Sequence, residues 1–234
     1  DVNKPTYTLA IAIEFLGTNY YGWQRQKKVL AVQQVLETAI SKVANETIEV
    51  VAAGRTDSGV HASNMMAHFV TRSNRPTRNW LRGINSLLPD DIALRWLQPM
   101  PVDFHARFKA IARRYRYITI NQPSRPAILN HQITHIRHPL DLSAMQLAAE
   151  TIVGTHDFTS FRAAACQSNQ PIRTVSHANL FALVDIGAPR KSECEECGRA
   201  GAAGAQFQLL LWGGLGGIEG TESAQSPFAV VVPA

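Results

Sequence analysis

An arginine and an aspartate stand two residues apart in the glycine-flanked segment Gly54-Arg-Thr-Asp-Ser-Gly59. The Asp57 carboxylate can serve as a nucleophile or as a base, and the neighbouring Arg55 cation favours its ionised form. Glycines at both ends permit a sharp turn and the close approach of a substrate. The same residues also suit an ordinary turn in which Asp57 accepts hydrogen bonds from nearby backbone N–H groups. Spacing by itself favours that second interpretation.

The elements around this segment follow a regular pattern. Apolar residues alternate with smaller or polar ones at 7–15, as in a strand, and recur every three or four positions at 32–43, as in an amphipathic helix. The same reasoning predicts strands at 47–53, 65–70 and 92–96 and a helix at 76–88. The order β-α-β-β-α-β is the ferredoxin-like arrangement also used by the RRM, with a four-stranded antiparallel sheet and both helices on one face.

A proline-flanked segment at 100–103 marks a boundary between two predicted domains, residues 1–103 and 104–234. Residues 106–120 can form one long strand, which places Arg113 and Tyr115 on one face and Arg114 on the other. The fold class we expect is therefore α+β, with two RRM-like halves.

The second half begins like the first, because a helix capped by Asp141 or Ser143 and stopped by Gly154 precedes a strand at 173–186. From residue 187 onward Gly and Ala dominate, and we predict only short strands at 206–212 and 228–232. The second half is therefore expected to be incomplete.

Charge is distributed unevenly along the chain. Residues 1–184 carry 20 Lys and Arg against 12 Asp and Glu, whereas residues 185–234 carry 3 against 6. Three windows, 15–36, 58–89 and 104–140, contain no acidic residue. Basic windows without local neutralisation favour a polyanionic partner, although a solvated basic surface is the plainer alternative.

Aromatic, amide and basic residues share the segment at 17–28, where Tyr20, Tyr21 and Trp23 lie beside Arg25. Such a mixture suits the stacking of bases and contacts to phosphates, but the same aromatic side chains could equally close the edge of the core. Histidines occur singly, at His61 among other positions, and we interpret them as structural.

Three cysteines, Cys166, Cys194 and Cys197, are too few and odd in number for a secreted disulfide framework, which favours a reducing, cytoplasmic compartment. The pair Cys194-Glu-Glu-Cys197 has half the spacing of a zinc site, but no second pair follows, so we expect no metal. No run of 18 apolar residues is present, and we expect no membrane span.

Several separated motifs resemble the tRNA pseudouridine synthase A family, in the family's order. The segment Gly54-Arg-Thr-Asp-Ser-Gly-Val-His61 matches its signature, and the resemblance extends over about residues 6–186. The other matching motifs are Tyr20-Tyr-Gly-Trp-Gln-Arg-Gln26, Asn85 to Pro89 with Asp91-Ile92, Phe104-His-Ala-Arg-Phe108, Ala112-Arg-Arg-Tyr-Arg-Tyr117, Asp157-Phe-Thr-Ser-Phe-Arg162 and Arg173-Thr-Val175.

The resemblance implies an isomerase that converts uridine to pseudouridine at positions 38, 39 and 40 in the anticodon stem-loop of tRNA. It implies that Asp57 is the catalytic residue, that Arg55 pairs with it and helps to displace the target nucleotide, and that Tyr115 contacts the target base. It further implies two RRM-like halves joined across a central basic cleft, a homodimer, and no cofactor. The residues that we expect to hold the RNA are Arg25, Arg107, Arg113 and Arg114.

The reaction breaks the N1–C1′ bond, turns the uracil and rejoins it through C5. A carboxylate can assist by covalent attack or by removing the C2′ proton, and the sequence does not choose between them. Because the uridine lies in or beside a stacked stem, it must be flipped out. Tyr115 has a plainer interpretation as a packed strand tyrosine.

Residues 187–234 do not resemble the family, and a Met-Val-Arg motif that would supply an active-site arginine is not found there. This departure raises the alternative of a catalytically impaired tRNA-binding protein or RNA chaperone. A basic domain with no RNA role is the third hypothesis.

Overall fold

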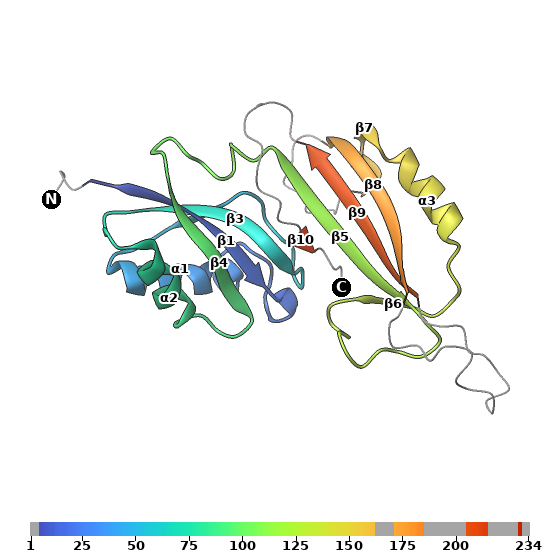
Figure 1. Ribbon diagram of the computed structural model, residues 1–234, viewed down its shortest axis with the longest axis horizontal. Coiled ribbons are helices and arrows are strands. Elements are labelled where there is room, and N and C mark those ends of the chain that lie inside the picture. The colour runs from blue at the N-terminus through green and yellow to red at the C-terminus, as the bar shows by residue number, and fades with distance from the viewer. Residues whose placement is uncertain (1–4, 162–170, 185–204, 215–228, 231–234) are drawn as a thin grey trace. The chain divides into compact units, whose positions relative to one another are not determined.

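The chain folds into two compact units, with the boundary between Ile111 and Ala112. The computed structural model describes residues 5–161, 171–184, 205–214 and 229–230 (Figure 1). Helices and antiparallel strands are mixed in one chain, which confirms the predicted α+β class. Each unit has its own sheet, and the two units are described separately below.

The first unit contains a four-stranded antiparallel sheet and two α-helices. The strand order is β2-β3-β1-β4, so β1 lies between β3 and β4. The predicted alternation of strands and helices is confirmed here, with a single 3₁₀ turn added after β1. The elements are β1 (Tyr7–Phe15), η1 (Gly17–Asn19), α1 (Val32–Ala44), β2 (Val50–Ala52), β3 (Ala62–Thr71), α2 (Thr77–Asn85) and β4 (Ile92–Met100).

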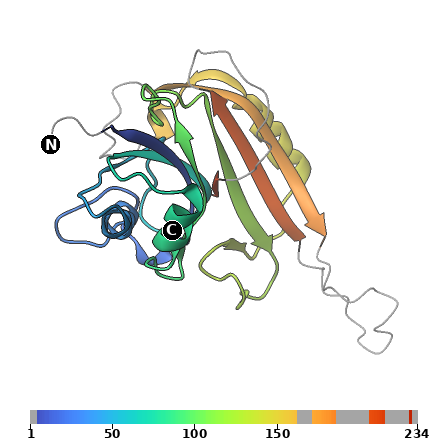
Figure 2. The ribbon, with the colours of Figure 1, turned by 60° about the vertical axis from the view of Figure 1, so that its left-hand side comes forward.

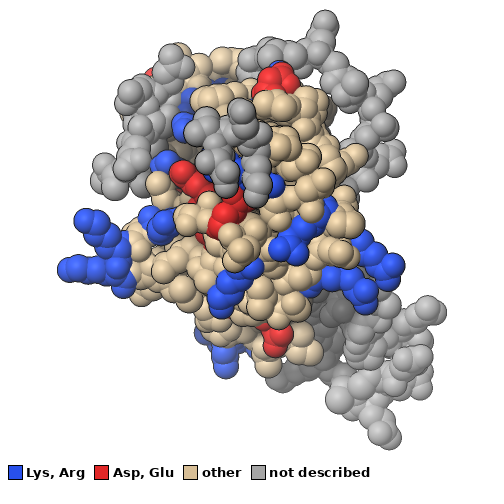
Figure 3. Space-filling model, turned by 90° about the vertical axis from the view of Figure 1, so that its left-hand side faces the viewer, with Lys and Arg blue, Asp and Glu red and all other residues tan. Residues whose placement is uncertain are grey.

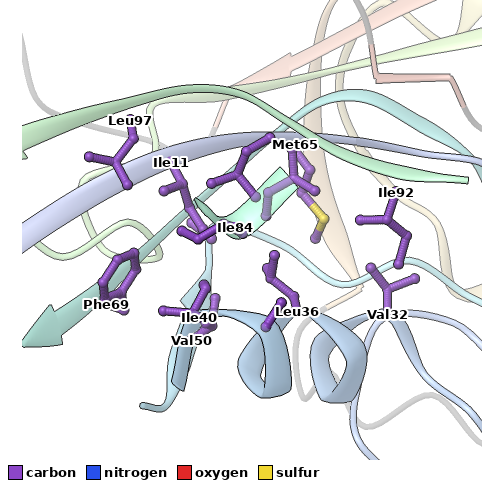
Figure 4. Packing of buried hydrophobic residues seen from close by; sticks show 14 of the residues in the cluster. Ile11, Val32, Leu36, Ile40, Val50, Met65, Phe69, Ile84, Ile92 and Leu97 are labelled. Carbon is purple, nitrogen blue, oxygen red and sulfur yellow. The ribbon is translucent and has the colours of Figure 1, made fainter. Parts of the chain in front are cut away.

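The hydrophobic core of this unit lies between the sheet and the helices α1 and α2. Figure 4 shows Leu36 and Ile40 of α1 pointing toward side chains of the sheet, among them Ile11 and Phe69. Leu36, Ile40 and Ile11 are fully buried, which is what the three- and four-residue spacing predicts for one face of a helix. The helix ends at Asn45, whose left-handed backbone (φ 57°) is a common helix-terminating conformation.

Residues 106–111 do not belong to a strand, and this corrects the prediction of one long strand over 106–120. The strand β5 begins only at Ala112 and runs to Asn121. Before it, the N–H of Ala106 donates to Nδ1 of His68 on β3 (3.2 Å), and the N–H of Lys109 donates to the carbonyl of His105 (2.9 Å). These bonds fold the segment into a turn despite its alternating sequence.

The second unit has a sheet with the order β5-β9-β8-β7, all antiparallel, and β6 pairs in parallel with β5. The helix α3 packs against β8 (Figures 1 and 2). Its N-terminus is capped by Asp141, whose Oδ1 accepts from the N–H of Ala144 (3.0 Å), which confirms one of the two predicted caps. The remaining elements are β6 (Thr134–Ile136), α3 (Leu142–Thr151), β7 (Gly154–Asp157), η2 (Thr159–Phe161), β8 (Ile172–Val184) and β9 (Ala205–Gly214).

The two short strands predicted near the C-terminus are present as β9 and as β10 (Ala229–Val230). The three cysteines lie outside the described residues. Within the part of the chain that the structure describes, no helix is long and apolar enough to cross a membrane.

Candidate active site

The segment that carries Arg55 and Asp57 is a loop between β2 and β3, and residues 54–60 are called the signature loop below. Both charged side chains are exposed. The N–H of Val60 donates to the carbonyl of Asp57 (3.2 Å), and Gly59 has a left-handed backbone (φ 77°) that favours glycine. The loop is therefore a closed turn with its carboxylate directed to solvent, so the turn and the catalytic interpretations of Asp57 are compatible.

A second loop, residues 16–26, lies against the signature loop and is called the aromatic loop. The N–H of Trp23 donates to the carbonyl of Thr56 (3.0 Å), and the N–H of Gly59 donates to the carbonyl of Tyr20 (3.2 Å). Two backbone bonds therefore bracket Asp57, one on each side of it in sequence. The peptide carrying the carboxylate is held by neighbouring backbone as well as by its own turn.

The aromatic loop is itself fixed to the start of α1. The carbonyls of Gly22 and Trp23 accept from the first helical N–H groups, those of Val32 (3.2 Å) and Gln33 (3.0 Å). These donors would otherwise lack partners inside the helix, so the loop replaces an N-cap side chain. Bonds thus run continuously from α1 through the aromatic loop to the peptide of Asp57.

The structure separates the aromatic residues of this loop, which the sequence left as either base-stacking or core groups. Tyr20 and Trp23 are 4% and 3% exposed and belong to the core, whereas Tyr21 is 59% exposed. Tyr20 and Trp23 therefore build the support of the signature loop. Tyr21 alone of the three offers a ring to solvent.

Two further residues support this geometry: His61, for which the sequence indicates a structural role, and Asp91, which was missed as a site residue. The ring Nδ1 of buried His61 accepts from the N–H of Gly17 (2.9 Å), which confirms its structural role. The carboxylate of Asp91, just before β4, accepts from the hydroxyl of Tyr20 (2.6 Å). Both contacts join residues more than 40 positions apart, so only the family motifs, which include both residues, gave any signal for them.

Arg25, predicted to bind RNA, forms an ion pair with Glu37 of α1. The Glu37 side chain is 5% exposed, and its Oε1 also accepts from the N–H of Val50 (2.9 Å). Part of the Arg25 charge is therefore balanced inside the protein. The ion pair ties the aromatic loop to α1 and β2.

Arg107 is exposed in the turn before β5, with its guanidinium carbon 6.0 Å from the centre of the Phe108 ring. Phe108, 72% exposed, stacks on His105 with ring centres 4.2 Å apart. The ring centre of His105 in turn lies 4.9 Å from that of His68. Burial and the charge of His105 lower the pKa of His68. This turn presents a cation and an aromatic ring to solvent together.

Tyr115, Arg113 and Arg114 lie on β5 in the second unit, where Tyr115 is 40% exposed and both arginines are half-buried. Burial and the charge of Arg114 lower the pKa of Arg116, two positions along the strand. Such coupling fits the predicted placement of Arg114 and Arg116 on one face. The exposure of Tyr115 leaves part of its ring open to a ligand.

Basic side chains are not gathered in a single place on the face shown in Figure 3. Lys and Arg occupy several positions there, with Asp and Glu between them. Among the residues that the structure describes, no three potential metal ligands come together.

Comparison with known proteins shows the family to which the chain is related. The family model described as tRNA pseudouridine synthase matches residues 11–109 and 148–189. This chain belongs to the tRNA pseudouridine synthase family. The family is one of isomerases, and the match includes both the aromatic loop and the signature loop.

Relatives within the tRNA pseudouridine synthase family are close in sequence. Proteins named tRNA pseudouridine synthase A from Klebsiella pneumoniae (strain 342) and Enterobacter sp. (strain 638) are 51% and 52% identical over 190 residues, which is 79% of this chain and 70% of each relative. One from Acinetobacter baumannii (strain SDF) is 55% identical over 173 residues, 74% of this chain and 65% of the relative. Tyr115 lies between the two segments that the family model matches.

Proposed function

We propose that this protein isomerises uridine to pseudouridine at positions 38, 39 and 40 in the anticodon stem-loop of tRNA, with Asp57 as the catalytic residue. The observation that carries the proposal is the exposed Asp57 carboxylate on a loop bracketed by backbone hydrogen bonds to Tyr20 and Trp23. A fixed backbone with an open carboxylate is what attack on, or proton removal from, a nucleotide needs. Membership of the tRNA pseudouridine synthase family supports the same reaction.

The proposed chemistry needs no cofactor, because the N1–C1′ and C5–H bonds are broken, the C5–C1′ and N1–H bonds are formed, and the nucleotide is neither oxidised nor reduced. Asp57 either attacks the nucleotide or takes the C2′ proton. Arg55, in the same exposed loop, enters beside the flipped nucleotide, and Tyr115 contacts the uracil. Both alternatives require a carboxylate within reach of the ribose, which the closed turn of the signature loop supports.

Binding of tRNA is proposed to rest on Arg25, Arg107, Arg113 and Arg114. Arg107 has the clearest support, because it is exposed beside an exposed aromatic ring in an acid-free part of the sequence. Such a combination serves phosphate contact and stacking together. We further propose a cytoplasmic homodimer with a basic cleft between two RRM-like halves; the low, odd number of cysteines fits a reducing compartment.

The test uses three unmodified anticodon stem-loops, each with a single uridine, at position 38, 39 or 40. Wild-type protein is expected to give pseudouridine in all three, mapped by carbodiimide-dependent stops in reverse transcription. Asp57→Asn is expected to give none, while Asp90→Asn, which alters another exposed aspartate, should match the wild type. Absence of stops with wild-type protein on every substrate would contradict the proposal.

Retained tRNA binding with no product from wild-type protein would instead support the alternative of an impaired tRNA-binding protein. Binding is therefore measured in the same samples at several salt concentrations, since phosphate contacts weaken as salt rises. Salt-independent retention would contradict both RNA-based interpretations.

A further inference from the structure

Tyr20 contacts the signature loop and the start of β4 with opposite ends of one residue. Its hydroxyl donates to Oδ1 of Asp91 (2.6 Å), and its carbonyl accepts from the N–H of Gly59 (3.2 Å) and from the hydroxyl of Ser58 (3.4 Å). Ser58 and Gly59 directly follow Asp57. One buried residue therefore connects Asp91, just before β4, to the peptide after the proposed catalytic carboxylate.

Asp91 is well placed to fix this residue. Its carbonyl accepts from the N–H of Leu16 (2.9 Å), and its Oδ2 accepts from the side-chain amide of Asn19 (3.4 Å). Asp91 therefore binds the aromatic loop at three points, through backbone and both carboxylate oxygens. A hydrogen bond to a charged carboxylate is among the stronger ones in proteins.

The hydroxyl of Tyr20 remains a donor under all ordinary conditions. Burial raises the pKa of Tyr20, and the hydrogen bond to Asp91 and the charge of Asp91 raise it further. The tyrosine therefore stays neutral across the working pH range, and its hydroxyl keeps the proton that it donates to Asp91.

We propose that Tyr20 and Asp91 are a positioning pair, which holds the Asp57 peptide in its reactive place through the bond from Gly59 to Tyr20. The inference rests on the proposed function for its rate effect, but its structural part can be measured without activity. Neither residue touches the substrate in this account. They act through the backbone, and a misplacement of about 1 Å at a reacting group can cost on the order of 10²-fold in rate.

The variant Tyr20→Phe removes only the hydroxyl, and Tyr7→Phe makes the same change at the start of β1, in a residue outside the proposed site. At saturating stem-loop, Tyr20→Phe is expected to lower the single-turnover rate by about ten- to a hundredfold with an unchanged Kd, whereas Tyr7→Phe keeps the wild-type rate. Asp91→Asn keeps an acceptor oxygen and should retain more activity than Asp91→Ala. Equal rates for the two tyrosine variants would overturn the inference.

Hydrogen exchange of the Gly59 amide provides the readout that does not depend on catalysis. Tyr20→Phe is expected to speed exchange at Gly59 by about tenfold, as loss of roughly 1.4 kcal/mol of local protection implies, while Ile11 in β1 stays protected. Unchanged exchange at Gly59, or equal acceleration at Gly59 and Ile11, would overturn the positioning role. If wild-type protein forms no pseudouridine, the proposed function fails and the exchange result still decides this inference.

Discussion

Gly22 faces the peptide of Asp57 so closely that a Cβ atom on it would lie 3.1 Å from the Asp57 carbonyl carbon and 2.6 Å from the Thr56 oxygen. The aromatic loop and the signature loop are therefore packed backbone against backbone. Only glycine permits this approach, and Gly22 also has a left-handed backbone (φ 80°). The place of Asp57 depends on a residue 35 positions earlier, which has no side chain.

Gly22→Ala is expected to push the Asp57 peptide away and to lower the rate of pseudouridine formation by about 10²-fold. Gly59→Ala is the matched control, because Gly59 has a similar left-handed backbone (φ 77°), and a Cβ there meets no atom within 4 Å. Both variants carry about 1 kcal/mol of backbone strain, but only the first creates a collision. Equal rates in single-turnover assays would refute the steric explanation.

Glu37→Ala is expected to lower the free energy of unfolding by about 1–3 kcal/mol. The change leaves the N–H of Val50 without its carboxylate acceptor and removes the ion pair with Arg25. Thermal or urea unfolding measures the loss, and Glu49→Ala, which alters an exposed glutamate beside Val50, should be nearly neutral. A loss no larger than that of Glu49→Ala would show that the buried contacts contribute little.

The lowered pKa of His68 predicts that the protein loses stability in mild acid. Burial and the charge of His105 lower the pKa of His68 from its ordinary value of 6.5, against a weaker opposing effect of a hydrogen bond with the backbone of Val51. The unfolded chain therefore binds the proton more readily. Stability is fully present above pH 6.5 and falls as the pH drops below it toward the folded-state pKa.

This pH dependence is tested by unfolding His68→Asn from pH 5 to 8. Asparagine keeps an acceptor for the N–H of Ala106 but cannot titrate, so the fall in stability below pH 6.5 should become smaller. His138→Asn changes an exposed histidine and should keep the wild-type profile. If both variants show the same profile as wild type, His68 is not responsible.

Arg107→Ala is expected to weaken tRNA binding and to reduce the slope of log K against log salt by about one. Arg95→Ala serves as the control, because Arg95 pairs with Glu14 (3.3 Å) and its charge is already balanced. Filter binding at four salt concentrations gives both slopes. A slope for Arg107→Ala equal to that of wild type would show that Arg107 does not contact a phosphate.

Elements with a clear hydrophobic period were predictable from sequence. The helix α1 and the strand β1 follow directly from apolar spacing at 32–43 and 7–15. The short strands β6 and β7 were missed, because three or four residues carry too little alternation to be recognised. The start of β5 was placed too early, since the bond from Ala106 to His68 spans 38 positions and leaves no local trace.

The residues of the candidate site likewise fall into those that the sequence indicated and those that it did not. Asp57 and Arg55 were found from a local motif, and the structure places both on one exposed loop. The support from Tyr20, Gly22 and Asp91 depends on contacts between distant segments, which spacing within one segment cannot reveal. Sequence therefore indicates the proposed reactive groups better than the residues that hold them.

Release of the C5 hydrogen tests the central claim most directly. Joining C5 of uracil to C1′ displaces that hydrogen, so tRNA carrying [5-³H]uridine at positions 38–40 must lose tritium to water as pseudouridine forms. Wild-type protein is expected to release tritium from these positions, and Asp57→Asn is expected to release none. No release by wild-type protein, or equal release by Asp57→Asn, would contradict this account of the Asp57 loop.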